Sequence, residues 1–391
     1  MKLNLFELSV AFSSKSNKEL KRAYLLFKLM KSKRLVNSAK KLLSIAMKTG
    51  IPVSWAVKPT IYRQFVGGKN IFDSLTVVDK LQQYNVKSIL DYSVEGTDDS
   101  ESMDVALEET LRTIDQASNN PNIPFTVFKP TAFASSWLLE NAIPGKPFDD
   151  TMQNLYSDFH TRIGVLCQRA YEMDVPIMVD AEESWYQHLV DEIIEEMMAK
   201  YNKEKAIVFN TLQMYRHDRI RFFKEQIEKA KTRNYFLGVK LVRGAYMEKE
   251  RNRALLKGYP SPICETKQQT DESFHQALKI ALDHIDLVEI FCGSHNEQSI
   301  MLLANEMTKR NLKPDDRRIW FSQLYGMSDH ITFNLAHHGF NACKYIPYGP
   351  VKSVIPYLFR RAEENSSITG QTTRELDLLK KERLRRKTHK V

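Results

Sequence analysis

The sequence lacks any uninterrupted run of about 18 apolar residues, so no membrane-spanning helix is expected from it. Cysteine is scarce, and no C-x-x-C pair occurs. The four cysteines are Cys167, Cys264, Cys292 and Cys343. Their wide spacing argues against a disulfide framework or a structural zinc site and predicts a reducing compartment. The N-terminus has no apolar signal core, and Glu7 and Glu19 are atypical of an acid-poor transit peptide, so we expect a cytoplasmic protein.

What the chain does contain is typical of a folded globular protein. Of its 391 residues, 42% are hydrophobic and 27% are charged, which is enough for one large domain with extensions. The net charge of +9 is concentrated in residues 15–41 and in the segment KKERLRRKTHK (380–390). Such segments are usually solvated faces. The functional alternative is peripheral contact with anionic lipid. No nucleic-acid partner is expected, because no binding motif accompanies the charge.

The pattern of apolar residues divides the chain into three parts. Residues 1–85 read as a helical N-terminal extension, residues 86–370 as a catalytic domain, and residues 371–391 as a basic C-terminal tail. The middle part alternates short apolar runs with helical spacing, and the runs are 88–94, 125–130, 176–182, 206–212, 236–242, 287–293, 319–325 and 342–348. Eight such units predict an α/β protein with a (β/α)8 barrel. A doubly wound open sheet is the alternative fold.

Polar side chains at the ends of these runs favour the barrel over the open sheet. They are Lys129, Asp180, Asn210, Lys240, Ser294 with His295, Gln323 and Tyr345. In a barrel, the functional residues gather at the carboxyl ends of many strands, whereas an open sheet collects them at one crossover. Each of these residues alone is explained equally well as a capping or loop residue. Their recurrence predicts one shared site at the mouth of the barrel.

Two long segments resemble the proline dehydrogenase family: VKLVRGAYMEKER (239–251) and YIPYGPVKSVIPYLFRRAEEN (345–365). Shorter similarities are FVGG, ILDYSVEG, VDAEES, FNTLQMY, SHN and QLYGMSDH, so the resemblance covers roughly residues 65–370. It implies a distorted TIM barrel with noncovalent FAD, and oxidation of L-proline to 1-pyrroline-5-carboxylate, the first step of proline catabolism. It also implies hydride transfer to FAD and a quinone as the next electron acceptor. We expect the chain to be monofunctional, without an aldehyde dehydrogenase domain.

The substrate carboxylate requires a cation, and the pair Arg360 and Arg361 is the strongest candidate. Val351, Val354 and Leu358 form a helical apolar stripe after Pro350, and this stripe continues into Arg361. A guanidinium group on a buried face calls for an anion, which a bound amino acid supplies. The alternative is surface salt bridges with the neighbouring glutamates. A helix beginning at Pro350 would carry Arg360 about 15 Å from its start, so we expect the last barrel helix to lie across the C-terminal mouth.

The resemblance assigns roles to the remaining residues. Asp180 and Lys240 are implied as catalytic, and Lys129, Tyr246, Tyr345, Arg360 and Arg361 as substrate-binding. Lys129 and Asp180 are expected to form an ion pair, and Tyr345 favours proline over hydroxyproline. The FAD-binding set is Ala181, Asn210, Gln213, Lys240, Val242, Arg243, Gly244, Thr266, Lys267, Ser294 and His295. Lys240 and Arg243 have exchanged places relative to many short bacterial relatives, which affects the grip on the flavin.

Several alternatives follow from the same residues. No G-x-G-x-x-G motif is present, so FAD would be held by the barrel mouth and not by a Rossmann turn. His295 and Cys292 have no third ligand at suitable spacing, so no metal is expected. Lys129 or Lys240 would suit a Schiff-base lyase, because such enzymes use lysines as nucleophiles. The basic ends would suit a non-enzymatic adaptor.

Overall fold

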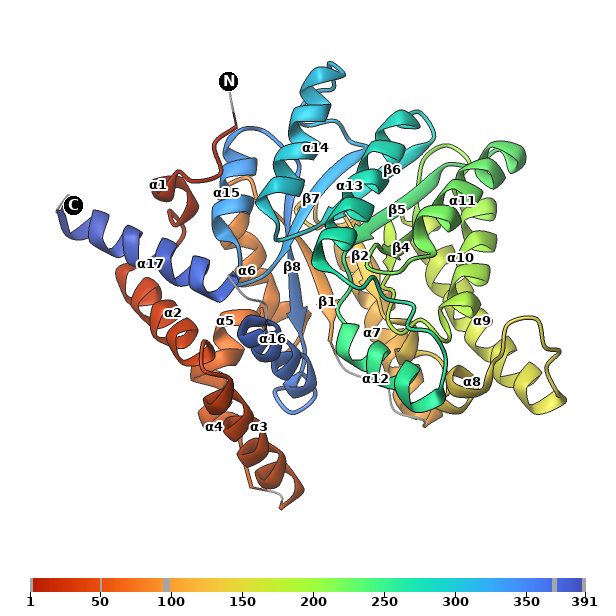
Figure 1. Cartoon of the computed structure of the whole chain (residues 1–391), viewed down its shortest axis with the longest axis horizontal. Coiled ribbons are helices and arrows are strands. Elements are labelled where there is room, and N and C mark those ends of the chain that lie inside the picture. Colours follow the sequence, from red (N-terminus) through yellow and green to blue (C-terminus); the bar gives the residue numbers. More distant parts are fainter. Residues whose placement is uncertain (1–2, 50, 94–98, 368–370, 389–391) are drawn as a thin grey trace. The chain divides into compact units, whose positions relative to one another are not determined.

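The computed structural model describes residues 3–49, 51–93, 99–367 and 371–388. Its strands form one parallel eight-stranded sheet in the order β1-β8-β7-β6-β5-β4-β3-β2 (Figure 1). They are β1 (Lys87–Tyr92), β2 (Thr126–Phe128), β3 (Ile177–Val179), β4 (Val208–Gln213), β5 (Leu237–Val242), β6 (Val288–Gly293), β7 (Ile319–Leu324) and β8 (Ala342–Tyr348). Because β1 lies beside β8, the sheet has the strand order of a nearly closed (β/α)8 barrel. The predicted fold class is confirmed, and all eight predicted runs are strands.

Helices precede the sheet and connect its strands. Before β1 the chain forms α1 (Leu8–Ala11), α2 (Asn17–Met30), α3 (Lys33–Lys48), α4 (Ser54–Val57), η1 (Lys58–Tyr62), α5 (Arg63–Phe65) and α6 (Ile71–Gln82). Between the strands lie α7 (Ser100–Ser118), η2 (Pro130–Ala132), α8 (Ser136–Asn141), α9 (Asp150–Glu172), α10 (Gln187–Tyr201), α11 (Arg219–Arg233), α12 (Met247–Lys257), α13 (Lys267–Asp283), α14 (Glu297–Lys309) and α15 (Asp329–His337). After β8 follow α16 (Ile355–Ser367) and α17 (Gln371–Thr388). Among the described residues, no helix is long and apolar enough to cross a bilayer.

The chain divides into two compact units. The first contains residues 1–95 and 323–391, and the second contains residues 96–322. The first unit is therefore discontinuous in sequence. The second is one uninterrupted segment that carries β2 to β6 and most of β7, with helices α7 to α14.

Aromatic side chains form a cluster, called the floor below, around Phe125 inside the second unit. The ring of Phe125 lies 5.5 Å from that of Phe209, 5.1 Å from that of Phe291 and 5.3 Å from that of Trp320, with edge-to-face geometry. Gly238 pairs with Phe209 in the sheet, and a Cβ atom there would lie 2.7 Å from the phenyl ring. Glycine at this position therefore makes room for the floor. Two residues further along β5, on the same face, comes Lys240.

The first unit has its own core, built from both ends of the chain. Phe12, Leu20 and Phe27 of the N-terminal segment are buried in one cluster with Leu378 and Leu379 of α17. Residues 371–388, which we predicted as a basic tail, are thus a helix whose apolar side packs into this core. The many lysines and arginines of this segment obscured the helical spacing of its apolar residues in the sequence. The helical nature of the N-terminal extension is confirmed by α1 to α6.

Candidate functional site

A bridging carboxylate stands at the carboxyl end of the sheet in the second unit. Asp180 directly follows β3, and its Oδ1 lies 2.5 Å from the Nζ of Lys240, while its Oδ2 lies 3.1 Å from the Nζ of Lys129. The predicted pair of Lys129 and Asp180 is present, and Lys240 joins it. All three side chains are largely buried, with exposures of 15% for Asp180, 8% for Lys240 and 14% for Lys129. One carboxylate thus forms ion pairs with two ammonium groups in a largely buried environment.

This arrangement bears on the Schiff-base alternative. A lysine that attacks a carbonyl must be a neutral amine. The Nζ atoms of Lys129 and Lys240 instead form ion pairs with the Asp180 carboxylate. The geometry therefore does not favour nucleophilic attack by either lysine.

Beside the bridging carboxylate lies a second, weaker acid. Glu182 is buried, and burial together with the neighbouring Glu183 raises its pKa to about 7. Its carboxylate accepts hydrogen bonds from the backbone N–H of Thr131 at 3.1 Å and from the Thr131 hydroxyl at 3.0 Å. Glu182 can therefore gain or lose a proton near neutral pH, within two residues of Asp180.

Gln213 ends β4 with a fixed orientation. Its Nε2 donates to the carbonyl oxygens of Ala181, at 3.3 Å, and Glu182, at 2.8 Å. The Oε1 atom of Gln213 and the Oγ1 atom of Thr211 are buried without a hydrogen-bond partner among the described residues. Thr211 pairs with Lys240 in the sheet and Gln213 with Val242, so these side chains share one face. Two buried acceptors on that face are suited to a ligand that donates hydrogen bonds.

Arg243, just past β5, organises the next part of the site. Its Nε and NH2 atoms contact Asp271 at 2.8 and 2.7 Å, its NH1 donates to the Ser294 hydroxyl at 2.9 Å, and its NH2 donates to the Ser299 hydroxyl at 2.8 Å. The guanidinium also lies over the ring of Phe274, 4.5 Å from its centre. Lys267 forms an ion pair with the same Asp271. Three predicted residues, Arg243, Ser294 and Lys267, are thus brought together around an aspartate that was not predicted.

The turn after β5 requires glycine. Gly244 has a φ of +127°, and a Cβ atom there would lie 2.4 Å from the ring of Tyr215. Tyr246 follows and is the N-cap residue of α12. Glycine here is explained by the positive φ and the neighbouring Tyr215 ring, and the contact of Gly244 with a cofactor stays a prediction.

The other predicted residues have simpler surroundings. The Thr266 hydroxyl caps α13 by accepting from the backbone N–H of Gln269, so its position has a structural explanation. His295 is half-buried and lies two residues after the end of β6. Tyr345 lies in the middle of β8, in the first unit, and is 6% exposed. Lys344, its neighbour, contacts Asp329 of α15, so alternation places Tyr345 on the opposite face of the strand.

Arg360 and Arg361 also belong to the first unit, on α16. The predicted apolar stripe is buried, and Arg361 is itself only 7% exposed, with its guanidinium 5.5 Å from the ring centre of Tyr357. The predicted start of the helix at Pro350 is wrong, because residues 351–354 form turns and α16 begins at Ile355. Arg360 therefore lies about 7.5 Å along the helix, half the distance we expected. The placement of this helix across the barrel mouth stays a prediction.

The strand-end assignment of Asn210 is wrong, and Gln323, which does lie at the end of β7, contacts a helix. Asn210 lies in the middle of β4, which continues to Gln213, and the Asn210 amide donates to Asp191 of α10 at 2.9 Å. Gln323 accepts a hydrogen bond from Thr332 of α15 at 2.7 Å. Both side chains bind residues of helices and so lie on the outer face of the sheet. Runs of buried residues conceal the phase of a strand, which is why the sequence did not separate Asn210 from Thr211.

Three residues of this region were missed from the sequence. Thr211 alternates with Gln213, Asp271 stands four residues after Lys267, and Glu182 stands two after Asp180. The first two spacings are strand and helix periodicities and contained a usable signal. The raised pKa of Glu182 depends on burial beside Glu183, which the sequence does not show.

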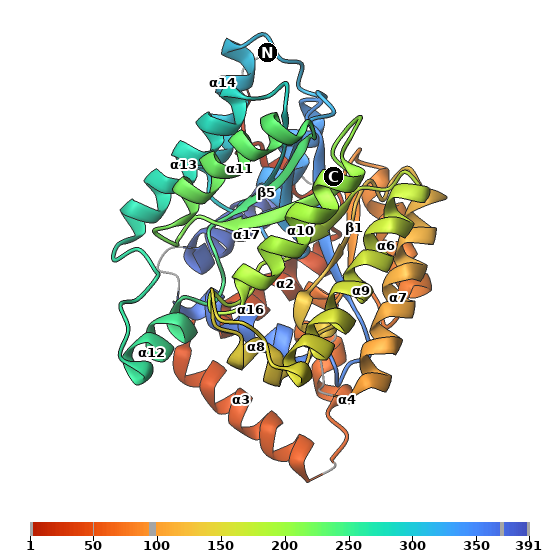
Figure 2. The ribbon, with the colours of Figure 1, turned by 90° about the vertical axis from the view of Figure 1, so that its right-hand side faces the viewer.

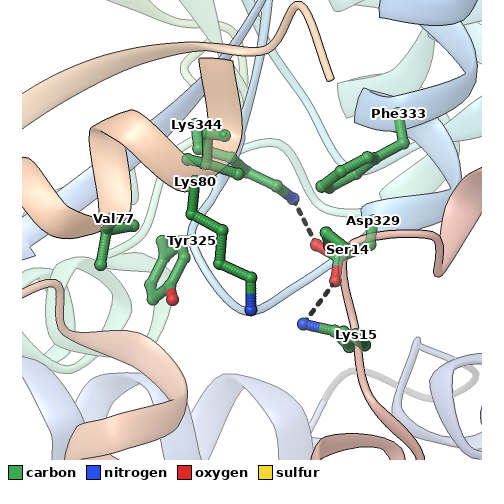
Figure 3. Close-up of a pocket in the computed structure, with 9 residues that line it drawn as sticks. Ser14, Lys15, Val77, Lys80, Tyr325, Asp329, Phe333 and Lys344 are labelled. Carbon is green, nitrogen blue, oxygen red and sulfur yellow. Dashed lines mark ion pairs between the residues drawn. The ribbon is translucent and has the colours of Figure 1, made fainter. Parts of the chain in front are cut away.

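A separate cavity lies in the first unit and does not suit a substrate. It measures about 20 Å³ and is lined by Lys15, Tyr325, Asp329 and Lys344 among others (Figure 3). Asp329 contacts Lys15 at 3.0 Å and Lys344 at 2.9 Å. Its volume is suited to about one water molecule. In the described part of the chain, no group of three or more His, Cys, Asp or Glu residues is arranged to hold a metal ion, and all four cysteines are buried and free.

Comparison with known proteins gives consistent results. Residues 74–374 match the sequence model of the family described as proline dehydrogenase. The carbapenem antibiotics biosynthesis protein CarD of Pectobacterium carotovorum subsp. carotovorum is 36% identical over 322 residues, which cover 82% of this chain and 83% of CarD. The mitochondrial proline dehydrogenase 1 of Dictyostelium discoideum is 31% identical over 431 residues, covering 98% of this chain and 75% of that protein.

A solved structure shares the fold. Proline utilization A (PutA) from Bdellovibrio bacteriovorus, inactivated by N-propargylglycine, superposes with a TM-score of 0.72 at 20% identity. The match covers 95% of this chain, and this chain spans 40% of that protein.

Proposed function

Since the chain belongs to the proline dehydrogenase family of oxidoreductases, we propose that it oxidises L-proline to 1-pyrroline-5-carboxylate with FAD as the hydride acceptor and a quinone as the next acceptor. The observation that supports this most is the carboxylate of Asp180 between Lys129 and Lys240, at the end of a buried strand. The reaction removes a hydride from the ring carbon and a proton from the ring nitrogen, which leaves a C=N bond. It requires a dry pocket that holds an amino acid with a fixed orientation.

The carboxylate is the anionic group of proline, and three cationic side chains are assigned to bind it. Lys129, Arg360 and Arg361 bind the proline carboxylate, and the fork of a guanidinium group fixes its orientation. Asp180 forms an ion pair with Lys129. Tyr246 and Tyr345 form the walls around the ring by aromatic contact, and the bulk of Tyr345 disfavours a ring hydroxyl, so proline is preferred to hydroxyproline.

The residues present fit FAD. The orphaned Oε1 of Gln213 and Oγ1 of Thr211 supply buried acceptors. A backbone contact is assigned to Gly244. The remaining FAD contacts are assigned to Ala181, Lys240, Val242, Arg243, Thr266, Lys267, Ser294 and His295. Asn210 is the weakest of the predicted contacts, because its amide binds Asp191. FAD supplies the acceptor for the hydride, and Lys240 contributes positive charge where negative charge develops.

The test is a visible spectrum of the purified chain before and after addition of L-proline under anaerobic conditions. We expect a flavin spectrum that bleaches with L-proline. Arg361→Ala should raise the KM for proline at least about tenfold, the effect of one lost charge-assisted contact. Arg162→Ala, which removes an ion pair of a different helix, is the control and should leave KM unchanged. A colourless protein that does not take up FAD would exclude the proposal.

The setting of the enzyme is part of the same proposal. We expect a cytoplasmic protein with peripheral contact to the inner face of the membrane, where a quinone is found. Activity with a water-soluble electron acceptor but none with quinones in vesicles would contradict the choice of acceptor while leaving proline oxidation intact.

A further inference from the structure

Helix α3 (Lys33–Lys48) leaves an apolar stripe uncovered. Its packed side carries Val36, which is buried, and Leu43, which packs against the core of the first unit. The adjacent side carries Leu35, Leu42 and Ile45, which are 53%, 68% and 59% exposed. Large apolar side chains that gather on one exposed face mark an interaction site more often than scattered ones do.

Cations border this stripe in a regular pattern. Arg34, Lys41 and Lys48 recur every seven residues, nearly two helical turns, and all three are exposed. Arg34 and Lys41 directly precede Leu35 and Leu42, so the basic row runs alongside the apolar one. The helix contains no aspartate or glutamate. A helix with an apolar face and basic flanks is typical of a segment that lies in the interface of an anionic bilayer.

The segment after α3 also exposes large apolar residues. Ile51 is 55% exposed, and Trp55 of α4 is 77% exposed. Tryptophan is amphipathic and is frequent where a protein meets the lipid headgroups. Ile51 and Trp55 thus add two large exposed apolar side chains within seven residues of the end of α3.

Three other basic residues of the first unit make protein contacts. Lys15 is bound to Asp329. Arg386 of α17 contacts Glu382 and donates to the carbonyl oxygens of Phe12 and Lys15. On α3, Lys40 forms an ion pair with Glu363, which holds the packed side of the helix against α16. Arg34, Lys41 and Lys48 instead project from the exposed face.

We infer that the exposed face of α3 docks on an anionic lipid surface. A second copy of the chain is a poorer occupant, because a symmetric pairing of α3 helices would bring basic rows together without any acid on either helix. An anionic bilayer satisfies both features: it receives the leucines among its acyl chains and neutralises the basic row. This inference rests on the membrane contact proposed above and names the surface that makes it; it does not depend on the chemistry in the barrel.

The test is sedimentation of the full chain with vesicles of phosphatidylglycerol and phosphatidylcholine, compared with vesicles of phosphatidylcholine alone. We expect binding only to the anionic vesicles, weakening as the salt concentration rises. Leu42→Glu should reduce the partition coefficient at least about tenfold, since one leucine is no longer buried. Lys41→Gln should reduce it about fivefold. Trp55 fluorescence should be quenched by brominated lipid.

The control is Val105→Glu on α7. Val105 is 53% exposed, and this change alters the net charge as Leu42→Glu does, so vesicle binding should be unchanged. All variants should keep wild-type circular dichroism and wild-type turnover with a water-soluble acceptor, which separates this test from that of the enzymatic proposal. The inference is overturned if the chain ignores anionic vesicles or if Leu42→Glu binds them as the wild type does. It is also overturned if Leu42→Glu merely dissociates a dimer.

Discussion

Removing the charge of Asp180 tests whether one carboxylate holds two buried cations. In the Asp180→Asn variant, Lys129 and Lys240 lose a counter-charge that lies 3.1 and 2.5 Å away. With an effective dielectric constant of about 20, each attraction amounts to about 5 to 7 kcal/mol before desolvation is subtracted. Breaking buried pairs in this way typically costs about 3 to 5 kcal/mol of unfolding free energy. We expect a loss in that range, measured by urea unfolding with flavin and far-UV signals.

The geometry also predicts an asymmetry among the variants. Lys240→Met should cost less than Asp180→Asn, because Asp180 keeps Lys129 as its partner. The cost of Asp180→Asn should shrink above pH 7, where Glu182 ionises and supplies a negative charge to Lys129. Asp104→Asn is the control: Asp104 is 62% exposed and 3.5 Å from Arg162, so the loss should be below about 1 kcal/mol. Equal losses in Asp180→Asn and Asp104→Asn would refute the reasoning.

Three further predictions concern other buried groups. Burial raises the pKa of Glu182 to about 7. The contribution of Glu182 to the unfolding free energy is therefore full below about pH 4.5 and is lost as the pH rises through 7. Glu182→Gln should flatten the pH dependence of the unfolding free energy by up to about 3 kcal/mol between pH 5 and 8. A wild type as flat as the variant would contradict this. Gly244→Ala should lower Tm by an amount equivalent to about 1 to 3 kcal/mol and reduce bound flavin, because the new Cβ meets Tyr215; unchanged values would show that the turn relaxes. Asp329→Ala should destabilise the chain more than Lys344→Met, because it leaves both Lys15 and Lys344 without their carboxylate partner, whereas Lys344→Met leaves Asp329 paired with Lys15. The reverse order of urea midpoints would count against a bridging role for Asp329.

Much of the fold followed from the sequence because strand and helix periods are local. The eight apolar runs, the Lys129–Asp180 pair and the buried stripe ending at Arg361 all derive from spacing or from the family resemblance. What failed depended on contacts between distant segments. Asn210 was misplaced because a strand buried on both sides shows no alternation. The helix at 371–388 was hidden because its apolar residues make sense only beside the N-terminal segment.

The division of the barrel also bears on synthesis. Residues 96–322 are contiguous and can assemble while the residues from 323 onward are still being made. Phe12, Leu20 and Phe27 cannot complete their core until Leu378 and Leu379 have emerged, more than 340 residues later. During translation the apolar side chains of the N-terminal segment therefore stay exposed until α17 has been synthesised. Chaperone binding to the nascent chain should be strongest just before α17 leaves the ribosome.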